Sequence, residues 1–457
     1  MDILFASARD LATAIRAREL SALEVLDAHL AQIEKHNPVL NAVVTLDAER
    51  ARERARAADA AVRQGELWGP LHGVPFTLKD SHSTAGMRTT VGCEELAMNI
   101  PREDSTVTAR LKAAGGILMG KTNVPAMLDD WQSCNPIFGC TSNPWNVDRT
   151  PGGSSGGAAA AVASGMSPFD IGSDLSGSLR VPAHFCGIFG LKPTEHRVSS
   201  AGFLRHPGSA PQSVRAMAAI GPLARTVEDL ALLYRIIAGP DGCDTDVSPV
   251  PVEEVPEVEL NDLRIAFAPN FPGFPAAEEI RDTVSELAEW VSPLASVVEE
   301  AALPYLDFTD DGKRAADLIA MMVGVFNPKE GDPAATLAQY LEALRWRDRS
   351  IHAWEEFFER WDVLLCPAAM VTAFPHRDRD APLQVDGDEV QYSLVGAHTT
   401  LFNYTGHPAI VLPYQLDQDG LPIGVQVVGK RWGESRLLGI AAALSRATGT
   451  FWRPPGY

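Results

Sequence analysis

Apolar residues near the start of the chain recur at the spacing of an amphipathic helix. They lie three or four positions apart between Val25 and Ile33, just after the capping box Ser21-Ala-Leu-Glu24, in which a serine and a glutamate satisfy free N–H groups. Asn37-Pro38 is predicted to end this helix, because proline cannot continue its hydrogen-bond pattern. Residues 47–64, rich in Ala, Arg and Glu, predict a second helix. Residues 1–65 are therefore predicted to form N-terminal helices.

The pattern changes between residues 70 and 240, where short apolar runs alternate with helical stretches. The runs Phe76–Leu78, Ile117–Met119 and Phe169–Ile171 are predicted to be buried strands. Thr106–Ala114 and Gly157–Ser164 are predicted to be helices. Strands that alternate with helices indicate a layered α/β architecture.

The rest of the chain resumes this alternation after one linker-like stretch, Asp241–Leu260, which holds three prolines and several acids. Helical patterns follow at residues 277–290, 305–360 and 434–447. Further strands are predicted at residues 261–268, 363–365, 409–412 and 424–428. The chain has 457 residues, of which 46% are apolar, so a sizeable core is available.

The charge balance narrows the classes of partner. Thirty-nine basic and 59 acidic residues give a formal charge of −20, without a run of basic residues. A surface for nucleic acid or for anionic lipid needs positive charge, so we expect neither partner. The N-terminus lacks the pattern of a signal peptide, and no apolar run approaches the ~20 residues that span a bilayer. We expect a cytoplasmic protein.

The spacing of the six cysteines indicates neither a metal site nor a set of disulfides. They show no CxxC spacing and are expected to be free thiols in a reducing compartment, at positions Cys93, Cys134, Cys140, Cys186, Cys243 and Cys366. The histidines at positions 72, 82, 184 and 206 show no ligand spacing either. We therefore expect no metal and no cofactor.

The candidate chemistry is concentrated between Thr150 and Pro182, where serines lie among closely spaced glycines. A hydroxyl attacks a carbonyl when a base takes its proton, and a neutral lysine can be that base. Lys79 ends a short apolar run upstream, in Gly73-Val-Pro-Phe-Thr-Leu-Lys79-Asp80. Glycines let backbone N–H groups approach a reacting carbonyl. This combination points to acyl transfer.

Two other motif matches lack their structural context. Gly115–Thr122 matches the phosphate-loop pattern GxxxxGK[ST], but Ile117, Leu118 and Met119 favour burial and Pro125 follows too soon for a long helix. Gly152-Gly-Ser154-Ser-Gly156 matches the G-x-S-x-G elbow of α/β-hydrolases, but a turn precedes it instead of a strand. No lysine follows a serine by three positions, as a penicillin-recognising enzyme requires.

The remaining arrangement resembles the amidase signature family of serine hydrolases. Matching blocks follow one another in family order over most of the chain, at residues 73–80, 120–123, 143–146, 151–157, 172–182, 186–193, 361–367, 403–409 and 420–426. The resemblance implies a single domain with a large mixed, twisted β-sheet covered on both faces by helices. Within residues 1–457 it implies a catalytic core at 66–240, a surface crossover at 241–260, and further core and substrate-pocket helices at 261–457.

The resemblance also implies a role for each reactive residue. Ser178 matches the nucleophile, Ser154 the bridging serine that follows a cis peptide bond in that family, and Lys79 the base, with its pKa lowered by burial. The implied oxyanion donors are the N–H groups of four consecutive residues, Leu175, Ser176, Gly177 and Ser178. The family usually has glycine where Ser176 stands. Ser176 as the nucleophile is disfavoured by its spacing to Leu179-Arg180-Val-Pro.

Neighbouring polar residues have alternative roles. Lys192 is the competing base, but the family match makes it structural. Ser155 is expected to support the loop. Ser173 and Asp174 are expected to hold a strand end, and Arg180 to brace the loop electrostatically.

The segments expected to set specificity contain large apolar residues. A substrate pocket and ordinary core packing explain them equally well; they are Met127, Leu128, Trp131, Met321, Met322 and Phe326. The pocket interpretation implies bulky apolar or aromatic amides, anilides, aryl esters or carbamates as small-molecule substrates of a monomer or homodimer. One alternative is the amidase subunit of an aminoacyl-tRNA amidotransferase, which hydrolyses glutamine within a complex. Another is a binding protein on an inactive hydrolase scaffold.

Overall fold

The computed structural model describes residues 1–204, 214–324, 335–379, 381–449 and 451–457. Its largest sheet has eight strands in the order β10-β9-β11-β15-β14-β7-β8-β6. Strands β10, β9 and β11 run parallel, and the other neighbouring pairs are antiparallel. The strands are β6 (Phe169–Asp174), β7 (Phe189–Lys192), β8 (Ala219–Ala224), β9 (Arg264–Phe267), β10 (Val297–Glu300), β11 (Val363–Pro367), β14 (Ala409–Leu416) and β15 (Pro422–Gly429).

Helices cover both faces of this sheet, as the alternation along β14 demonstrates. Val411 packs with α5 (Gly156–Ala163) and α6 (Arg180–Cys186). Its neighbours Ile410 and Leu412 pack with α7 (Val227–Ile237) and α12 (Glu434–Thr448). Successive side chains of a strand point to opposite faces, so the two helix pairs lie on opposite sides. The predicted mixed α/β fold is confirmed.

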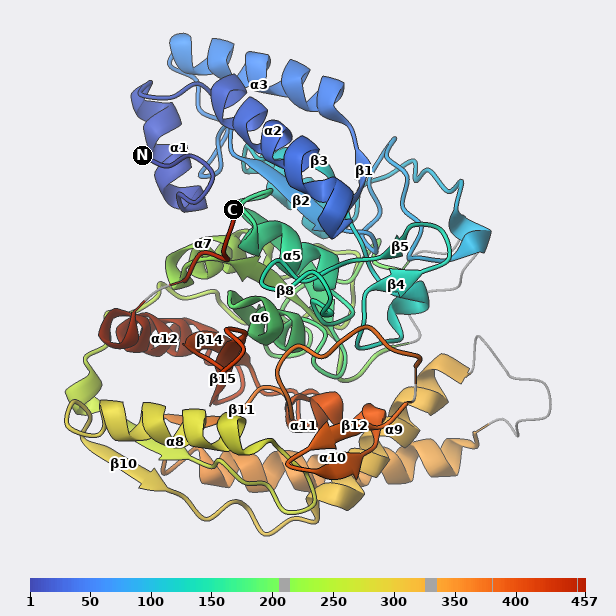
Figure 1. The fold of residues 1–457 in the computed structure, drawn as a ribbon, viewed down its shortest axis with the longest axis vertical. Helices are drawn as coiled ribbons and strands as arrows, with labels where there is room; N and C mark the ends of the chain where they lie inside the picture. The colour runs from blue at the N-terminus through green and yellow to red at the C-terminus, as the bar shows by residue number, and fades with distance from the viewer. Residues whose placement is uncertain (205–213, 325–334, 380, 450) are drawn as a thin grey trace.

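A second, three-stranded sheet lies under the N-terminal helices (Figure 1). Strand β3 (Ile117–Thr122) is its centre, antiparallel to β1 (Val43–Leu46) and parallel to β2 (Pro75–Lys79). The helices of this part of the chain are α1 (Ala8–Ala17), α2 (Ala22–Leu40), α3 (Ala48–Arg63) and α4 (Thr106–Ala113), of which α2 contacts β2 and α3 contacts β3. The apparent phosphate-loop motif therefore enters a buried strand, because residues 117–122 form β3.

The lower part of Figure 1 holds α8 (Glu278–Val291), α9 (Phe308–Gly324), α10 (Leu337–Phe357) and α11 (Ala397–Tyr404). Small hairpins are formed by β4 (Cys134–Asn135) with β5 (Gly139–Cys140), and by β12 (Leu383–Val385) with β13 (Asp388–Val390). Short 3-10 helices span Glu94–Leu96, Ala126–Leu128, Leu260–Asp262 and Tyr392–Gly396. Among the described residues, none of the helices combines the length and apolar composition that crossing a bilayer requires.

The predicted elements differ from the structure in two details near the N-terminus. Helix α2 continues through Pro38 to Leu40, so the predicted stop at Asn37-Pro38 is wrong. Proline lacks the N–H donor of a helical hydrogen bond, and in the last turn of a helix few further hydrogen bonds depend on it. The end is instead set by Asn41, which adopts the left-handed conformation and donates its N–H to the Asn37 carbonyl. Strand β1 also interrupts the region predicted to be helical.

The expectation of six free cysteines is also wrong. Cys134 and Cys140 form a disulfide, because the β4–β5 hairpin places them directly opposite each other. The other cysteines are free: Cys93, Cys186, Cys243 and Cys366. The sequence shows no sign of this pairing, because each of the two strands that bring the cysteines together has only two residues. Strands this short leave no pattern of apolar and polar positions.

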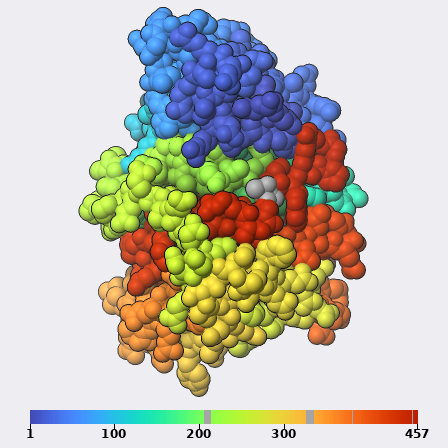
Figure 2. All heavy atoms as spheres, turned by 90° about the vertical axis from the view of Figure 1, so that its left-hand side faces the viewer, coloured from blue at the N-terminus to red at the C-terminus, as the bar shows by residue number. Residues whose placement is uncertain are grey.

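The two ends of the chain meet on one side of the molecule. Figure 2 shows C-terminal atoms against the N-terminal helices. The Phe5 and Phe451 rings stack with centroids 6.1 Å apart, and Arg453 lies over the Phe5 ring. Arg453 also pairs with Asp2 at 3.1 Å. These contacts fix the last residues beside α1.

Candidate active site

Lys79 ends β2 in the interior of the protein. All five residues of this strand are buried, and the lysine side chain is buried with them. Its backbone N–H donates to Asp170 on the adjacent β6 at 2.9 Å. Asp170 also accepts hydrogen bonds from Thr77 and Thr122, at 2.7 and 3.1 Å. The carboxyl of Asp170 therefore joins the small sheet to the large one directly behind the lysine.

The Lys79 amine is surrounded by serine hydroxyls. It donates to Ser154 Oγ and Ser155 Oγ at 2.8 Å each, and to Ser173 Oγ at 2.9 Å. Burial lowers the pKa of Lys79 to about 7, although the negative charges of Asp174 and Asp170 oppose that shift. At neutral pH a large fraction of the amine is thus uncharged and able to accept a proton.

Ser154 lies in a tight loop that precedes α5. The Gly153–Ser154 peptide bond is cis. Gly152 has φ of 85°, a conformation that favours glycine, and a Cβ on Gly153 would collide with the Asp130 carbonyl. Ser133 braces the loop: its Oγ donates to the Gly152 carbonyl and accepts from the Gly156 N–H, both at 3.0 Å. The glycines here are required for space as well as for backbone conformation.

Ser178 lies two residues before α6, at the turn that leaves β6. The carboxylate of Asp174 shapes this turn by accepting N–H hydrogen bonds from Gly177 at 2.8 Å and Leu179 at 3.1 Å. The Ser155 N–H donates to the Ser178 carbonyl at 3.1 Å. The loop that carries Ser154 and the loop that carries Ser178 are therefore joined directly.

A buried ion pair holds the Ser178 turn. Burial alone would raise the pKa of Asp174, but the Arg180 guanidinium at 2.8 Å lowers it to about 2. Arg180 also donates to the Thr399 carbonyl at 2.9 Å, to Gln426 Oε1 at 2.6 Å and to Asn403. The guanidinium therefore links the Ser178 turn to α11 and β15 and holds the turn in place.

The four predicted oxyanion donors are not equivalent. The N–H of Gly177 is occupied by Asp174. Within the part of the chain that the structure describes, the N–H groups of Leu175, Ser176 and Ser178 have no acceptor. Thr399 and Thr400 donate to the Ser176 carbonyl at 2.7 and 3.0 Å, which fixes that peptide group. Three N–H groups thus remain available to an oxyanion.

Lys192, the competing base, is also buried, and desolvation with the Arg180 charge lowers its pKa to about 7. Its amine donates to the carbonyl of the next residue, Pro193, at 3.0 Å. Lys79 differs in that its three hydroxyl contacts include Ser154. The lowered pKa does not distinguish the two lysines, but the contacts do.

The predicted pocket residues separate into two groups. Met321 and Met322 of α9 pack in one cluster with Leu175, beside the Ser178 turn. Trp131 packs in another cluster with Val181, and its backbone abuts Gly153. Met127 is 48% exposed and Leu128 lies beside it in a left-handed turn, and their place in a substrate pocket stays a prediction. Phe326 lies outside the described residues.

Sequence reasoning missed several residues that position this site. Ser133, Asp170 and Thr399 hold the two serine loops and the lysine strand. Ser133 and Thr399 lie outside the stretch from Thr150 to Pro182, and Asp170 lies inside it but away from its glycine-rich turns. Each of the three acts through contacts with residues distant in the chain. A buried polar residue in an apolar strand, such as Asp170 in Phe169-Asp-Ile171, was the one available signal.

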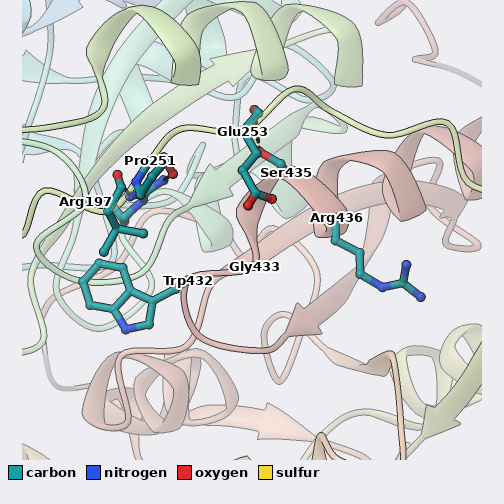
Figure 3. A pocket seen from close by; sticks show the side chains of 8 residues that line it. Arg197, Pro251, Glu253, Trp432, Gly433, Ser435 and Arg436 are labelled. Carbon is teal, nitrogen blue, oxygen red and sulfur yellow. Dashed lines mark hydrogen bonds between the residues drawn. The ribbon is translucent and has the colours of Figure 1, made fainter.

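Two further features involve none of these serines directly. A cavity of about 80 Å³ is lined by Arg197, Trp432 and Arg436, among others (Figure 3). Arg197 is engaged by the Val250 carbonyl at 2.7 Å and by Glu434 at 3.3 Å, so it is not free for a ligand. The second feature is a group of possible metal ligands, Cys134, Cys140 and His376.

Comparisons with known proteins find related sequences and related folds. The Amidase family model matches residues 24–321 and 313–438. A glutamyl-tRNA(Gln) amidotransferase subunit of Heliobacterium modesticaldum is 32% identical over 498 positions, covering 100% of this chain and 99% of the relative. A bacterial aryl acylamidase of the amidase signature family superposes with a TM-score of 0.86 at 27% identity, covering 97% and 96% of the chains. For 6-aminohexanoate cyclic dimer hydrolase the TM-score is 0.83 at 29% identity, covering 100% and 99%.

Proposed function

The chain belongs to the amidase family, and we propose that it hydrolyses amide bonds of small, largely apolar substrates through a serine acyl-enzyme. The observation that carries this proposal is the contact between Lys79 Nζ and Ser154 Oγ at 2.8 Å, in surroundings that favour the neutral amine. A buried neutral lysine beside a serine hydroxyl is a general base poised near physiological pH.

In the proposed reaction Ser178 Oγ bonds to the substrate carbonyl carbon. Its proton passes to Ser154, whose own proton passes to Lys79. Among the described residues Ser178 Oγ makes no hydrogen bond to Ser154, so this step requires the two hydroxyls to come together when the substrate binds, as catalytic contacts commonly do. The N–H groups of Leu175, Ser176 and Ser178 stabilise the oxyanion, while that of Gly177 holds the turn through Asp174. The proton returns through Ser154 to the leaving nitrogen as the C–N bond breaks. Water then attacks the acyl-enzyme by the same route and releases the carboxylic acid.

The surroundings of Ser178 support an apolar acyl group. Leu175 packs with Met321 and Met322, and Tyr340 and Leu344 of α10 belong to the same cluster. A glutamine substrate carries both an ammonium and a carboxylate, and burying these charges without partners is costly. The apolar cluster therefore favours amides, anilides, esters or carbamates with an uncharged acyl part. We propose the cytoplasm as its compartment and a monomer or homodimer as its state.

Glutamine hydrolysis within an amidotransferase complex is the second candidate. Its support is the 32% identity to a subunit of such an enzyme over the full length of this chain. In that role the chain would release ammonia from glutamine within the complex, and partner subunits would contact the tRNA, because this chain carries a charge of −20.

One assay on the isolated protein separates the two candidates. A panel of aryl amides, anilides, aryl esters, carbamates and glutamine is tested, with a fluorophosphonate probe as a readout of serine reactivity. The proposal expects turnover of apolar substrates and labelling at Ser178. Turnover of glutamine alone would favour the role in an amidotransferase. An unlabelled Ser178 together with no turnover would leave a binding protein on an inactive scaffold.

A further inference from the structure

Two cysteines of one hairpin and a histidine more than two hundred positions later meet beside the loop that carries Ser154. The ligand atoms of Cys134, Cys140 and His376 all lie within 4.8 Å of one another. The two cysteines face each other across the β4–β5 hairpin, and His376 comes from the segment after β11. Two sulfurs and one imidazole are a ligand set that zinc prefers.

The fold holds the histidine segment against the hairpin independently of the sulfurs. Gln132 Nε2 donates to the Arg377 carbonyl at 3.0 Å, and the Arg377 N–H donates back to Gln132 Oε1 at 3.0 Å. This reciprocal pair holds Gln132, two residues before Cys134, against Arg377, which directly follows His376. The backbone segments that carry the ligands are therefore held together before any ion binds, which reduces the ordering cost of binding.

The imidazole of His376 has little other use in the structure. Its Nδ1 faces the Cys134 sulfur at 4.0 Å. Its Nε2 is buried and has no hydrogen-bond partner in the described part of the chain. Buried polar atoms without a protein partner are rare, and such atoms commonly bind an ion or a water molecule. The histidine is therefore available as a ligand.

We propose that Cys134, Cys140 and His376 bind one zinc-like ion when the Cys134–Cys140 disulfide is reduced. A dithiol reductant supplies two electrons and two protons, so the S–S bond becomes two thiols and the reductant becomes a disulfide. Metal binding then displaces the two thiol protons and forms two metal–thiolate bonds and one metal–imidazole bond. Three protein ligands leave one tetrahedral position open to a further ligand. The disulfide and the metal exclude each other.

This site would connect the two segments that hold the Ser154 loop in place, one next to Cys134 and one next to His376. Cys134 follows Ser133, which bonds to Gly152 and Gly156. On the other side, the Phe374 carbonyl, two residues before His376, accepts the Thr150 N–H at 2.9 Å. An ion held between these segments would join them across the loop. The metal site does not depend on the proposed reaction.

Cobalt(II) binding tests the proposal on the full chain, because cobalt(II) replaces zinc and thiolate ligands give it an intense absorption. Protein reduced with a phosphine is expected to bind one Co²⁺ per chain with this absorption, and added Zn²⁺ is expected to displace it. Oxidised protein is expected to bind none. Cys134→Ser and Cys140→Ser should abolish the absorption, and His376→Ala should weaken affinity by about tenfold or more. Cys243→Ser, at an exposed free cysteine, is the matched control and should change nothing.

A second measurement needs no variant. Reduced wild-type protein is alkylated with and without Zn²⁺, and the modified cysteines are located by mass spectrometry. The proposal expects Zn²⁺ to protect Cys134 and Cys140 and to leave Cys243 reactive. Reduced protein that binds no Co²⁺, binding that persists in Cys134→Ser, or protection absent at both hairpin cysteines would overturn it.

Discussion

The Ser155 N–H donates to the Ser178 carbonyl at 3.1 Å, which ties the start of α5 to the turn before α6. The same residue places its Oγ on the Lys79 amine at 2.8 Å. Ser155 thus contacts both ends of the proposed proton path without belonging to it. Its amide joins the two serine loops, and its hydroxyl joins the first of them to the lysine at the end of β2.

Replacing Ser178 by alanine should lower kcat/KM by about 10³-fold or more, because it removes the group that forms the acyl bond. The fold should persist, since Ser178 Oγ makes no hydrogen bond in the described part of the chain. Steady-state kinetics and the melting temperature measure the two effects. Ser176→Ala is the control for the neighbouring hydroxyl, and it should retain activity. The opposite pattern would assign the nucleophile to Ser176.

The pH dependence of kcat/KM should report the Lys79 amine. The base must be neutral, and burial lowers its pKa to about 7. Activity should therefore rise about tenfold per pH unit below that value and level off above it. A lysine with an ordinary pKa would instead give activity that still increases toward pH 10. Lys192→Met should keep the midpoint, whereas a lost midpoint would make Lys192 the base.

Replacing Arg180 by alanine should destabilise the protein by about 3–5 kcal/mol, because the buried Asp174 carboxylate loses its partner. Urea denaturation measures the free energy of unfolding. Arg436→Ala removes a half-exposed ion pair with Asp362 and should change it by less than about 1 kcal/mol. Equal losses of unfolding free energy in the two variants would show that the buried Asp174–Arg180 pair contributes no more to stability than the half-exposed pair.

Replacing Ser133 by alanine should cost about 1–3 kcal/mol of stability and should also lower activity. The change leaves the Gly152 carbonyl and the Gly156 N–H without their buried partner. Both groups flank Ser154, so the relay serine loses its support. Ser142→Ala is a nearby control whose side chain makes no hydrogen bond within the described ranges. Full activity in Ser133→Ala would mean that the loop holds itself.

The strongly patterned elements were predictable from sequence, and weakly patterned ones were not. β2, β3 and β6 appear where their apolar runs predicted strands, and Lys79 lies at the end of its strand. β8 contains Gly221 and Pro222, which disfavour strands, but pairing with β6 and β7 overrides that preference.

The candidate site was likewise predictable only where the local sequence is distinctive. The glycine-rich motif indicated the serines, but the sequence offered both Lys79 and Lys192 as the base. The contacts that separate Lys79 from Lys192, and those that place Ser133 and Thr399, join residues tens to hundreds of positions apart. The Cys134–Cys140–His376 group had no sequence signal, because its third member lies more than two hundred residues from the first.

The stacking of Phe5 on Phe451 has a practical consequence for engineering. Residues near both ends already lie in contact, so a short glycine-rich linker could join them and the backbone could be opened at an exposed loop elsewhere. Such a circular permutant would keep every contact of the serine loops. The order of the segments along the polypeptide could then be changed without changing the arrangement of the side chains at the proposed active site.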